Sequence, residues 1–569
     1  MQERDRNIRL LFIFLVLLLR QGVYAEWRPA IPDATGEEVL LFTDRALYAV
    51  EEELFFAVSL GQPVLPGSAD WSRVVYVELI RWDGSKLVQA KVPVEEGLAK
   101  GSLVIPDDLN SGNYYLRAYT KWMRNYSPYR YTYVKVKVVN PHRKSIDPGP
   151  SDETADVPAM KYLVSGCSDE IGIDLVKASC QRREMVEAEI MLPGGTDAGD
   201  VLVAVRLKES GEVPWNRCFS FESLDTVPAD GPAFLPEIYG LTVSGKILDA
   251  VTGEPVAGST VNLSSYSSSF YFSTTRSGED GLFIFTLPPE TGTRELHLAE
   301  EGEDAGEHEL LITSEFCNQP VTLPYEPFLI AGHERAVAEQ LIVNAQLMAR
   351  FRDDRVEDER DADEVAPFYG RPLSTTYVKE YIELIDLREF FFELVQPVLV
   401  NYNDQGPYLA LNTQGSMALY PPLVLMDNIP VENGGRLLEI PSARVSRIEV
   451  INKGYLVNNR RYSGIISIFS ENRDMAGLEM EEKRHFFNFS FFQEQQEDRF
   501  PEYVQATTGS TVPDLRNLLC WETGFQLTPG EAGQLHFFTC DAPGTYEVVV
   551  MHIGEDGKAV CGRSEFEVR

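Results

Sequence analysis

The stretch VLLFTDRALYAVEEELFFAVSL, residues 39–60, alternates apolar and polar side chains. The stretch SRVVYVELIRWDGSKLVQAKVPV, residues 72–94, repeats this alternation on both sides of the turn Asp83-Gly84. A period of two residues places the apolar side chains on one face of a β-strand. Strands of this length, separated by such turns, predict an antiparallel β-sandwich, and we expect a mainly β fold for the chain.

Part of the first stretch, FTDRALYAVEEEL at residues 42–54, resembles the opening strand of macroglobulin-type domains, whose usual phrase is TDR-x-x-Y-x-x-G-E. The matching positions are Thr43, Asp44, Arg45 and Tyr48, whereas Glu51 stands where the glycine is usual. The stretch LNSGNYYLRAYTKWMRN, residues 109–125, resembles the closing half of the version found in exported proteins of Bacteroidetes-type bacteria. The resemblance implies an Ig-like, macroglobulin-like sandwich over residues 37–141.

Three further β-sandwiches are expected along the chain. The runs EAEIMLPG and DVLVAVRLKES predict a second sandwich over residues 155–236. The phrase LTVSGKILDAVTGEPVAGSTVNL, residues 241–263, resembles the carboxypeptidase regulatory-like domain, a transthyretin-like sandwich, here at 238–315. That resemblance implies a packing and adhesion module without peptidase activity. The alternating C-terminal segment, 480–569, resembles the last sandwich of the same macroglobulin-containing bacterial proteins.

The stretch PPLVLMDNIPVENGGRLLEIPSARVSRIEVINKGY, residues 421–455, has two short apolar runs around Asp427-Asn428. A two-residue turn between strands needs positive φ, which Asp and Asn tolerate better than other non-glycine residues. With RYSGIISIFS at 461–470, this order resembles the plug domain of TonB-dependent receptors. The resemblance implies one small α/β plug-like domain over residues 366–472. A receptor barrel has roughly 22 strands, so we expect this plug-like domain to lack its barrel.

Residues 325–365 predict a helix followed by an acidic linker. The stretch HERAVAEQLIVNAQLMARF, residues 333–351, has apolar residues at helical spacing. The run RDDRVEDERDADEV that follows offers oxygen ligands for calcium at Asp353, Asp354, Glu357, Asp358, Asp361 and Asp363. Because the D-x-D-x-D-G spacing is missing and arginines interrupt the run, we favour a solvated linker. No metal ion and no cofactor are expected.

The N-terminus has the pattern of an export signal over residues 1–25. Arg4, Arg6 and Arg9 precede the apolar run Leu10–Leu19, and small residues before Ala25 provide a cleavage site. No later segment reaches the roughly 18 apolar residues that a spanning helix needs. We therefore expect an exported protein of the cell envelope, in the periplasm or associated with the outer membrane, without a membrane span in the mature chain.

The formal net charge is −36 at pH 7, which disfavours nucleic acid because phosphate recognition needs clustered Lys and Arg. The chain has seven cysteines, and export permits disulfides. Cys167 with Cys180, or Cys540 with Cys561, could bridge neighbouring strands. The alternative is that most are buried free thiols, and the odd number leaves at least one unpaired in a monomer.

No catalytic motif is present in the sequence. The C-x-E-Q phrase of a thioester, the H-E-x-x-H and H-x-x-E-H phrases, the G-x-S-x-G phrase and a phosphate-binding glycine loop are all missing. We therefore expect no enzyme, and a hydrolase with an unrecognised site is a much weaker hypothesis. An aromatic cluster could form a sugar-stacking platform or pack a sandwich face; it comprises Tyr114, Tyr115, Tyr119, Trp122, Tyr126, Tyr129, Tyr131 and Tyr133.

Two functions follow from these patterns. The first is a non-enzymatic envelope protein that binds envelope or outer-membrane proteins, as an accessory to nutrient uptake. Its predicted contacts are the hairpin Asp427, Asn428, Ile429 and Pro430 and the loop 452–462, although internal packing between domains is the alternative for these loops. The second is a glycan- or peptide-binding protein that uses Tyr119, Trp122 and Tyr126 on the first sandwich.

Overall fold

The protein is described here by a computed structural model. The structure describes residues 37–60, 72–150, 157–164, 167–194, 196, 199–208, 218–223, 232–265, 271–302, 307–332, 334–351, 368–369, 371–381, 384–403, 406–413, 416–431, 434–457, 460–472, 474–478, 484–494, 500–503, 513–554 and 559–569. The expected signal peptide, 1–25, and the acidic run 352–365 lie outside the described residues. The fold is mainly β, as the alternating sequence predicted.

The first sandwich has two sheets. The smaller sheet has the order β1-β3-β6, with β1 (Val39–Thr43), β3 (Glu53–Leu60) and β6 (Leu98–Val104). The larger sheet begins with the order β5-β4-β7-β8, with β5 (Lys86–Pro93), β4 (Val74–Ile80), β7 (Gly112–Tyr119) and β8 (Thr132–Val139). It is extended by β15 (Phe219–Phe221) and β9 (Met160–Tyr162), and β2 (Leu47–Ala49) pairs with β8 in parallel. Most residues of β4 and β7 are buried, which means that both faces of the larger sheet are covered.

The TDR-x-x-Y phrase forms a buried hydrogen-bond network at the start of this sandwich. The Asp44 carboxylate accepts hydrogen bonds from the Tyr48 hydroxyl at 2.7 Å, from Arg45 Nε at 2.9 Å and from the Phe55 amide at 3.0 Å. Burial raises the pKa of Asp44, and these donors oppose that rise. Glu51, which stands at the glycine position of the phrase, has a φ of 65°, a conformation that favours glycine. The phrase therefore fixes a turn and stabilises a buried carboxylate.

The second and the C-terminal sandwiches are one unit, which corrects the expectation of separate sandwiches at 155–236 and 480–569. One sheet has the order β10-β35-β34-β14-β32, with β12 beside β35, and the other has the order β11-β13-β33. The strands from the first half of the chain are β10 (Cys167–Asp169), β11 (Gly172–Leu175), β12 (Ser179–Cys180), β13 (Met185–Met191) and β14 (Gly199–Leu207). The strands from the end of the chain are β32 (Leu518–Leu527), β33 (Ala532–Phe538), β34 (Gly544–Ile553) and β35 (Ala559–Val568).

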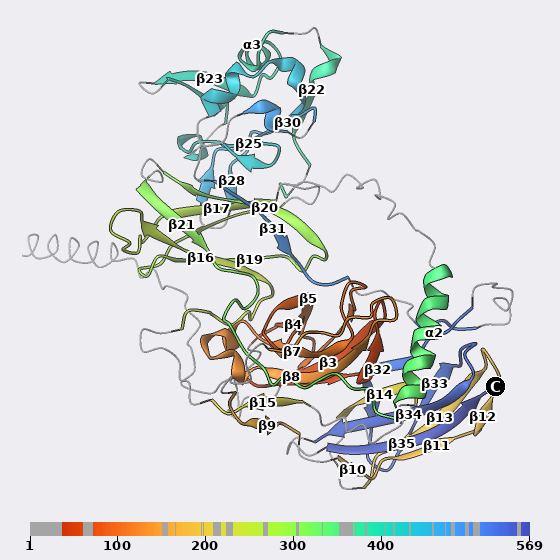
Figure 1. Ribbon diagram of the computed structural model, residues 1–569. Coiled ribbons are helices and arrows are strands. Elements are labelled where there is room, and N and C mark those ends of the chain that lie inside the picture. Colours follow the sequence, from red (N-terminus) through yellow and green to blue (C-terminus); the bar gives the residue numbers. More distant parts are fainter. Residues whose placement is uncertain are drawn as a thin grey trace, which may run out of the picture. The chain divides into compact units, whose positions relative to one another are not determined.

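We call this unit the composite sandwich, because each sheet contains strands from residues 167–207 and strands from residues 518–568 (Figure 1). Strand β14 pairs with β32 on one side and with β34 on the other, both antiparallel. Neither segment could bury its apolar face without the other, and the shared core contains Val203 and Val205 of β14 together with Val548 and Val550 of β34.

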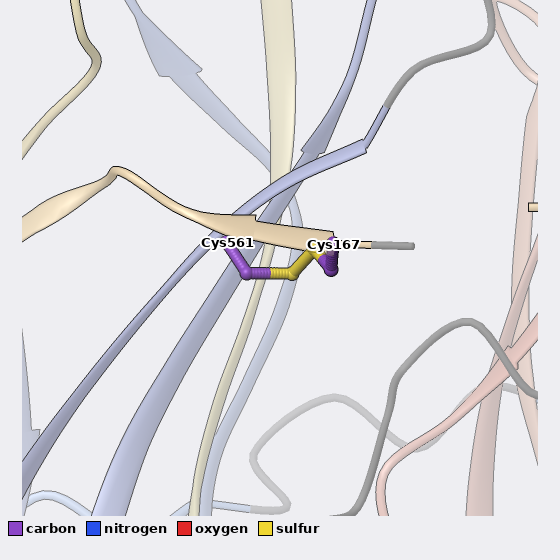
Figure 2. The surroundings of a disulfide bond; sticks show 2 residues. All are labelled: Cys167 and Cys561. Atoms are coloured by element: carbon purple, nitrogen blue, oxygen red, sulfur yellow. A yellow bond between two sulfur atoms is a disulfide. The ribbon is translucent and has the colours of Figure 1, made fainter. Parts of the chain in front are cut away.

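A disulfide joins Cys167 of β10 to Cys561 of β35, two strands that pair in parallel (Figure 2). The expected pairs Cys167–Cys180 and Cys540–Cys561 are therefore wrong, because both assumed that neighbours in sequence would pair. The remaining cysteines are buried free thiols: Cys180, Cys218, Cys317, Cys520 and Cys540.

A smaller sandwich follows the first half of the composite sandwich. One sheet has the order β19-β16-β21, with β19 (Leu282–Thr286), β16 (Thr242–Asp249) and β21 (His308–Ile312). The other has the order β18-β17-β20-β31, with β18 (Phe272–Arg276), β17 (Thr260–Ser265), β20 (Thr293–Glu301) and β31 (His485–Ser490). Strand β31 reaches this sandwich from about 180 residues later in the chain, so local sequence alone does not complete it.

Helix α2 (Arg335–Phe351) follows the small sandwich and contributes Ala338 and Leu341 to the core of the composite sandwich. Within the residues that the structure describes, no helix has both the length and the hydropathy to cross a membrane.

A mixed α/β part occupies residues 368–478. Its sheet has the order β22-β27-β30-β25-β26, with β22 (Ser374–Tyr377), β27 (Val445–Ile451), β30 (Ile465–Ser470), β25 (Leu423–Met426) and β26 (Ile429–Pro430). Helix α3 (Leu387–Glu393) lies near the hairpin of β23 (Val398–Asn403) and β24 (Gly406–Leu411), and β28 (Tyr455–Val457) pairs with β29 (Arg460–Tyr462). Leu387 and Phe390 of α3 share a core with Ile448 and Ile468 of the sheet.

Candidate docking groove

The predicted hairpin between β25 and β26 is buried and structural. Asp427 and Asn428 have φ values of 46° and 76°, as a two-residue turn requires. Asp427 and Asn428 are only 5% and 9% exposed, and Ile429 and Pro430 are buried. The Asp427 carboxylate accepts hydrogen bonds from the Ser470 amide at 2.7 Å, the Ser470 hydroxyl at 2.5 Å and the Met475 amide at 2.8 Å. The prediction of this hairpin as a partner contact is therefore corrected.

The second predicted contact, the loop 452–462, also faces the chain itself. Arg460 forms an ion pair with Glu301 of the small sandwich. Val457 and Tyr462 pack in a cluster with Leu425 and with Phe272 of β18. Internal packing, the alternative for these loops, accounts for their contacts.

The aromatic cluster of the first sandwich is covered as well. Tyr119, Trp122 and Tyr126 are 0%, 4% and 8% exposed, so they form no open platform for a sugar. Tyr119 stacks on Tyr131 with ring centroids 4.4 Å apart and on Tyr76 at 5.4 Å. The alternative function, glycan or peptide binding, required these aromatic side chains to be exposed. The structure corrects this expectation, because they are buried.

A groove lies elsewhere, on the mixed α/β part. It has a volume of about 790 Å³, and its lining comprises Tyr381, Leu384, Arg388, Glu389, Phe392, Glu393, Leu394, Val400 and Tyr402. Phe392 is 83% exposed and Tyr402 is 66% exposed. Exposed large apolar side chains that gather at a concave surface commonly mark a binding site.

Helix α3 positions one wall of this groove. Asp386 caps the helix by accepting a hydrogen bond from the Glu389 amide at 3.0 Å, and Glu389 accepts one from the Ile385 amide at 3.2 Å. Successive residues of a helix point about 100° apart. Phe390 and Phe391 are therefore buried, while Phe392 must point away from the core.

The run Phe390-Phe391-Phe392 was the signal that could have revealed the groove. An amphipathic helix buries one stripe of side chains, so three consecutive aromatic residues cannot all reach the core. Tyr402 lies between two asparagines near the end of β23, a strand whose last three residues are exposed.

The charged groups of the groove lie on the same helix. Glu389 and Glu393 are one turn apart and therefore share a face of α3. Arg388 lies beside them, and its Nε atom is buried without a hydrogen-bond partner in the described part of the chain. The groove combines aromatic walls with two carboxylates and one guanidinium, which suits recognition of a protein segment that is both apolar and charged.

Among the described residues, no three His, Cys, Asp or Glu side chains gather in a way that could hold a metal ion. The acidic run that was considered for calcium lies outside these residues.

The chain matches no protein-family model and no curated protein. Its fold is similar to trypsin-activated alpha-2-macroglobulin from Escherichia coli, with 9% identity, a TM-score of 0.22, and coverage of 93% of this chain and 41% of that one. Salmonella alpha-2-macroglobulin reacted with methylamine has 10% identity and a TM-score of 0.23, and the match covers 94% of this chain and 39% of that one. A tetra-tandem repeat from the extending region of a large adhesion protein has 9% identity and a TM-score of 0.13, and the match covers 94% of this chain and 100% of that one.

The chain thus spans about two fifths of the length of the alpha-2-macroglobulins. Similarity at these identities and TM-scores establishes neither a family nor an activity.

Proposed function

We propose that this protein is a non-enzymatic, exported docking protein of the bacterial cell envelope, and that the groove beside helix α3 binds a segment of a partner protein. The observation that carries the proposal is the exposure of Phe392 and Tyr402 at a groove of about 790 Å³. Burying two such side chains is worth about 1.5–3 kcal/mol each, enough to anchor a partner segment.

The charges of the groove favour a particular kind of partner. Glu389 and Glu393 present carboxylates beside the aromatic wall, and the chain carries a formal net charge of −36. An acidic protein steers a basic partner toward itself and repels an acidic one. The proposed partner segment therefore carries apolar side chains together with at least one Lys or Arg.

The resemblance of residues 366–472 to a receptor plug supports an outer-membrane protein of the uptake machinery as that partner. A plug contacts the polar wall of its barrel, and here the corresponding hairpin and loop are used for contacts within the chain. In this proposal the exposed groove takes over the role of the contact surface.

The absence of an enzymatic role is part of the proposal. The groove's described lining contains Tyr, Arg and Glu side chains but no Ser, Cys or His.

The test compares two double variants of the full-length protein. Phe392→Ser with Tyr402→Ser removes the aromatic anchors of the groove. Tyr239→Ser with Val251→Ser removes two side chains of the small sandwich region that are 62% and 92% exposed. Each tagged protein is purified from native envelopes, and the co-purified proteins are quantified by mass spectrometry.

We expect the groove variant to lose at least tenfold of its main partner, and the control variant to retain it. A Glu393→Lys variant should also weaken the complex and reduce its sensitivity to salt. An unchanged partner set in the groove variant would contradict the proposal.

A further inference from the structure

The connection between β21 and α2 runs along the first sandwich as an extended segment. Residues 314–329, which we call the strap, are all described and contain no helix or strand. Their sequence, SEFCNQPVTLPYEPFL, has prolines at positions 320, 324 and 327. Proline spaced in this way favours an extended backbone, because the ring fixes φ and removes the amide donor.

Side chains of the first sandwich bind the backbone of the strap. The hydroxyl of Tyr129 donates to the Thr322 carbonyl at 3.1 Å, and the hydroxyl of Tyr115 donates to the Pro324 carbonyl. Asn113 Nδ2 donates to the Glu326 carbonyl at 3.0 Å. All three bonds are accepted by backbone carbonyl groups, so they recognise the extended main chain of the strap and not its side chains.

Three further bonds near the start of the strap also involve its backbone. Arg124 Nη1 donates to the carbonyls of Ser314 at 2.9 Å and Glu315 at 3.0 Å. The Cys317 amide donates to the Tyr119 hydroxyl at 2.9 Å.

Apolar side chains of the strap fill sites on this face at intervals. Cys317, Val321 and Leu323 are 1%, 4% and 1% exposed. The positive φ of Gly84, 79°, belongs to the turn that Val321 contacts, and a Cβ at this glycine would lie 2.7 Å from the Val321 carbonyl oxygen. The surface is thus shaped for close approach of a peptide backbone.

Aromatic and ionic contacts add specificity. The Phe316 ring meets the Tyr76 ring edge to face at 5.6 Å, and the Tyr325 ring meets Trp82 at 5.8 Å. Lys91 Nζ, which is buried, lies 2.6 Å from the Glu315 carboxylate. An aromatic-lined surface that binds carbonyls of a proline-containing extended segment is a recurring mode of peptide recognition.

We propose that this face of the first sandwich is a recognition site for extended, proline-containing peptides, which the strap occupies as an intramolecular ligand. A partner peptide of the same chemistry binds the face when the strap opens. The site is separate from the groove beside α3, and its ligand class follows from different contacts.

Local opening is consistent with the exposure of the strap. Its residues Asn318, Gln319, Pro320, Glu326 and Pro327 are exposed, and Leu329 is 73% exposed. A segment with intermittent burial and no strand pairing opens at lower free energy than the sheets beneath it. Its tether gives it a high effective concentration, which a competing peptide must overcome.

Cys317 provides a direct measurement of strap opening. Its thiol is free and buried against the first sandwich, 3.3 Å from the Tyr131 hydroxyl. Cys520 and Cys540 are free and buried in the composite sandwich and serve as internal controls. The rate at which each thiol of the native full-length chain reacts with a maleimide is followed by mass spectrometry.

We expect Cys317 to react faster than the two control thiols. Tyr129→Phe deletes one hydrogen bond to the strap and should accelerate the reaction of Cys317 about fivefold. Tyr114→Phe is the matched control, because its hydroxyl donates to the Asn110 carbonyl at 2.7 Å, outside the strap, and it should leave this rate unchanged.

A synthetic peptide of residues 314–329 carrying Cys317→Ala then tests recognition in trans. At about ten times its Kd for the open face it should accelerate the reaction of Cys317 roughly tenfold, whereas a scrambled peptide should have no effect. If Cys317 reacts only together with Cys520 and Cys540, or if the two peptides act alike, the proposal is overturned.

Discussion

Cys167 and Cys561 are joined by a disulfide although 394 residues separate them in the sequence. Their strands lie side by side in parallel at one end of the composite sandwich. The bond therefore closes a loop of the chain. This loop contains strand β15 of the first sandwich, the small sandwich and the mixed α/β part. The disulfide stabilises the protein mainly because it lowers the conformational entropy of the unfolded chain.

Reduction of this disulfide should lower the free energy of unfolding by about 2–4 kcal/mol. Urea unfolding with and without a reducing agent measures the effect, and a Cys561→Ser variant provides the control. The reducing agent should not change the stability of that variant. An equal response of both proteins would show that another thiol is involved.

The orientation of helix α3 gives a second prediction. Phe390 is 0% exposed and Phe392 is 83% exposed. Phe390→Ala should cost about 3–5 kcal/mol of stability, whereas Phe392→Ala should change it by no more than about 0.5 kcal/mol. Chemical denaturation of the two variants distinguishes them, and similar losses would mean that Phe392 is not on the open side of the helix.

The Asp427-Asn428 turn gives a third prediction, which concerns stability. Asp427→Ala leaves the amides of Ser470 and Met475 without their buried acceptor, which should cost about 2–3 kcal/mol. Asn428→Gly should be nearly neutral, because glycine adopts the φ of 76° without strain. Thermal unfolding compares the two, and a severe loss at Asn428 would contradict the turn geometry.

The sequence allowed the fold class to be predicted, together with the turn at Asp427-Asn428, because both depend on local patterns. Alternation in residues 39–60 and 72–94 indicates the strands β1, β3 and β4, although β4 is buried on both faces. The pairing of β14 with β34 was not predictable, since alternation shows which face is buried but not which distant strand lies beside it.

The predicted contact residues and the groove lie in the same region of the chain but on different residues. The region 366–472 contains the groove, yet the hairpin chosen within it is buried. A turn sequence specifies backbone conformation and not exposure. Likewise the tyrosines of residues 114–133 indicated an aromatic face, but the segment that covers it comes from residues 314–329, far along the chain.

Buried tyrosines give a prediction about pH. Burial raises the pKa of Tyr76, Tyr119 and Tyr133 above the ordinary value near 10. Above about pH 9 the unfolded chain releases these phenolic protons first, so the folded state binds more protons and stability falls as pH rises. Each protected tyrosine contributes up to about 1.4 kcal/mol per pH unit in that range.

Urea unfolding between pH 8 and pH 11 measures this loss of stability. Tyr119→Phe should make it shallower, whereas Tyr239→Phe, at a residue that is 62% exposed, should leave it unchanged. Equal slopes in all three proteins would show that the buried phenols do not cause the alkaline loss.

The composite sandwich has a consequence for biosynthesis. Strands β10 to β14 leave the ribosome long before β32 to β35, so their apolar faces and strand edges wait for the last 52 residues of the chain. Pairing between such distant strands is slow, and open edges are prone to aggregation while they wait. Strands β10 to β14 therefore need to be shielded until β32 to β35 are available to pair with them.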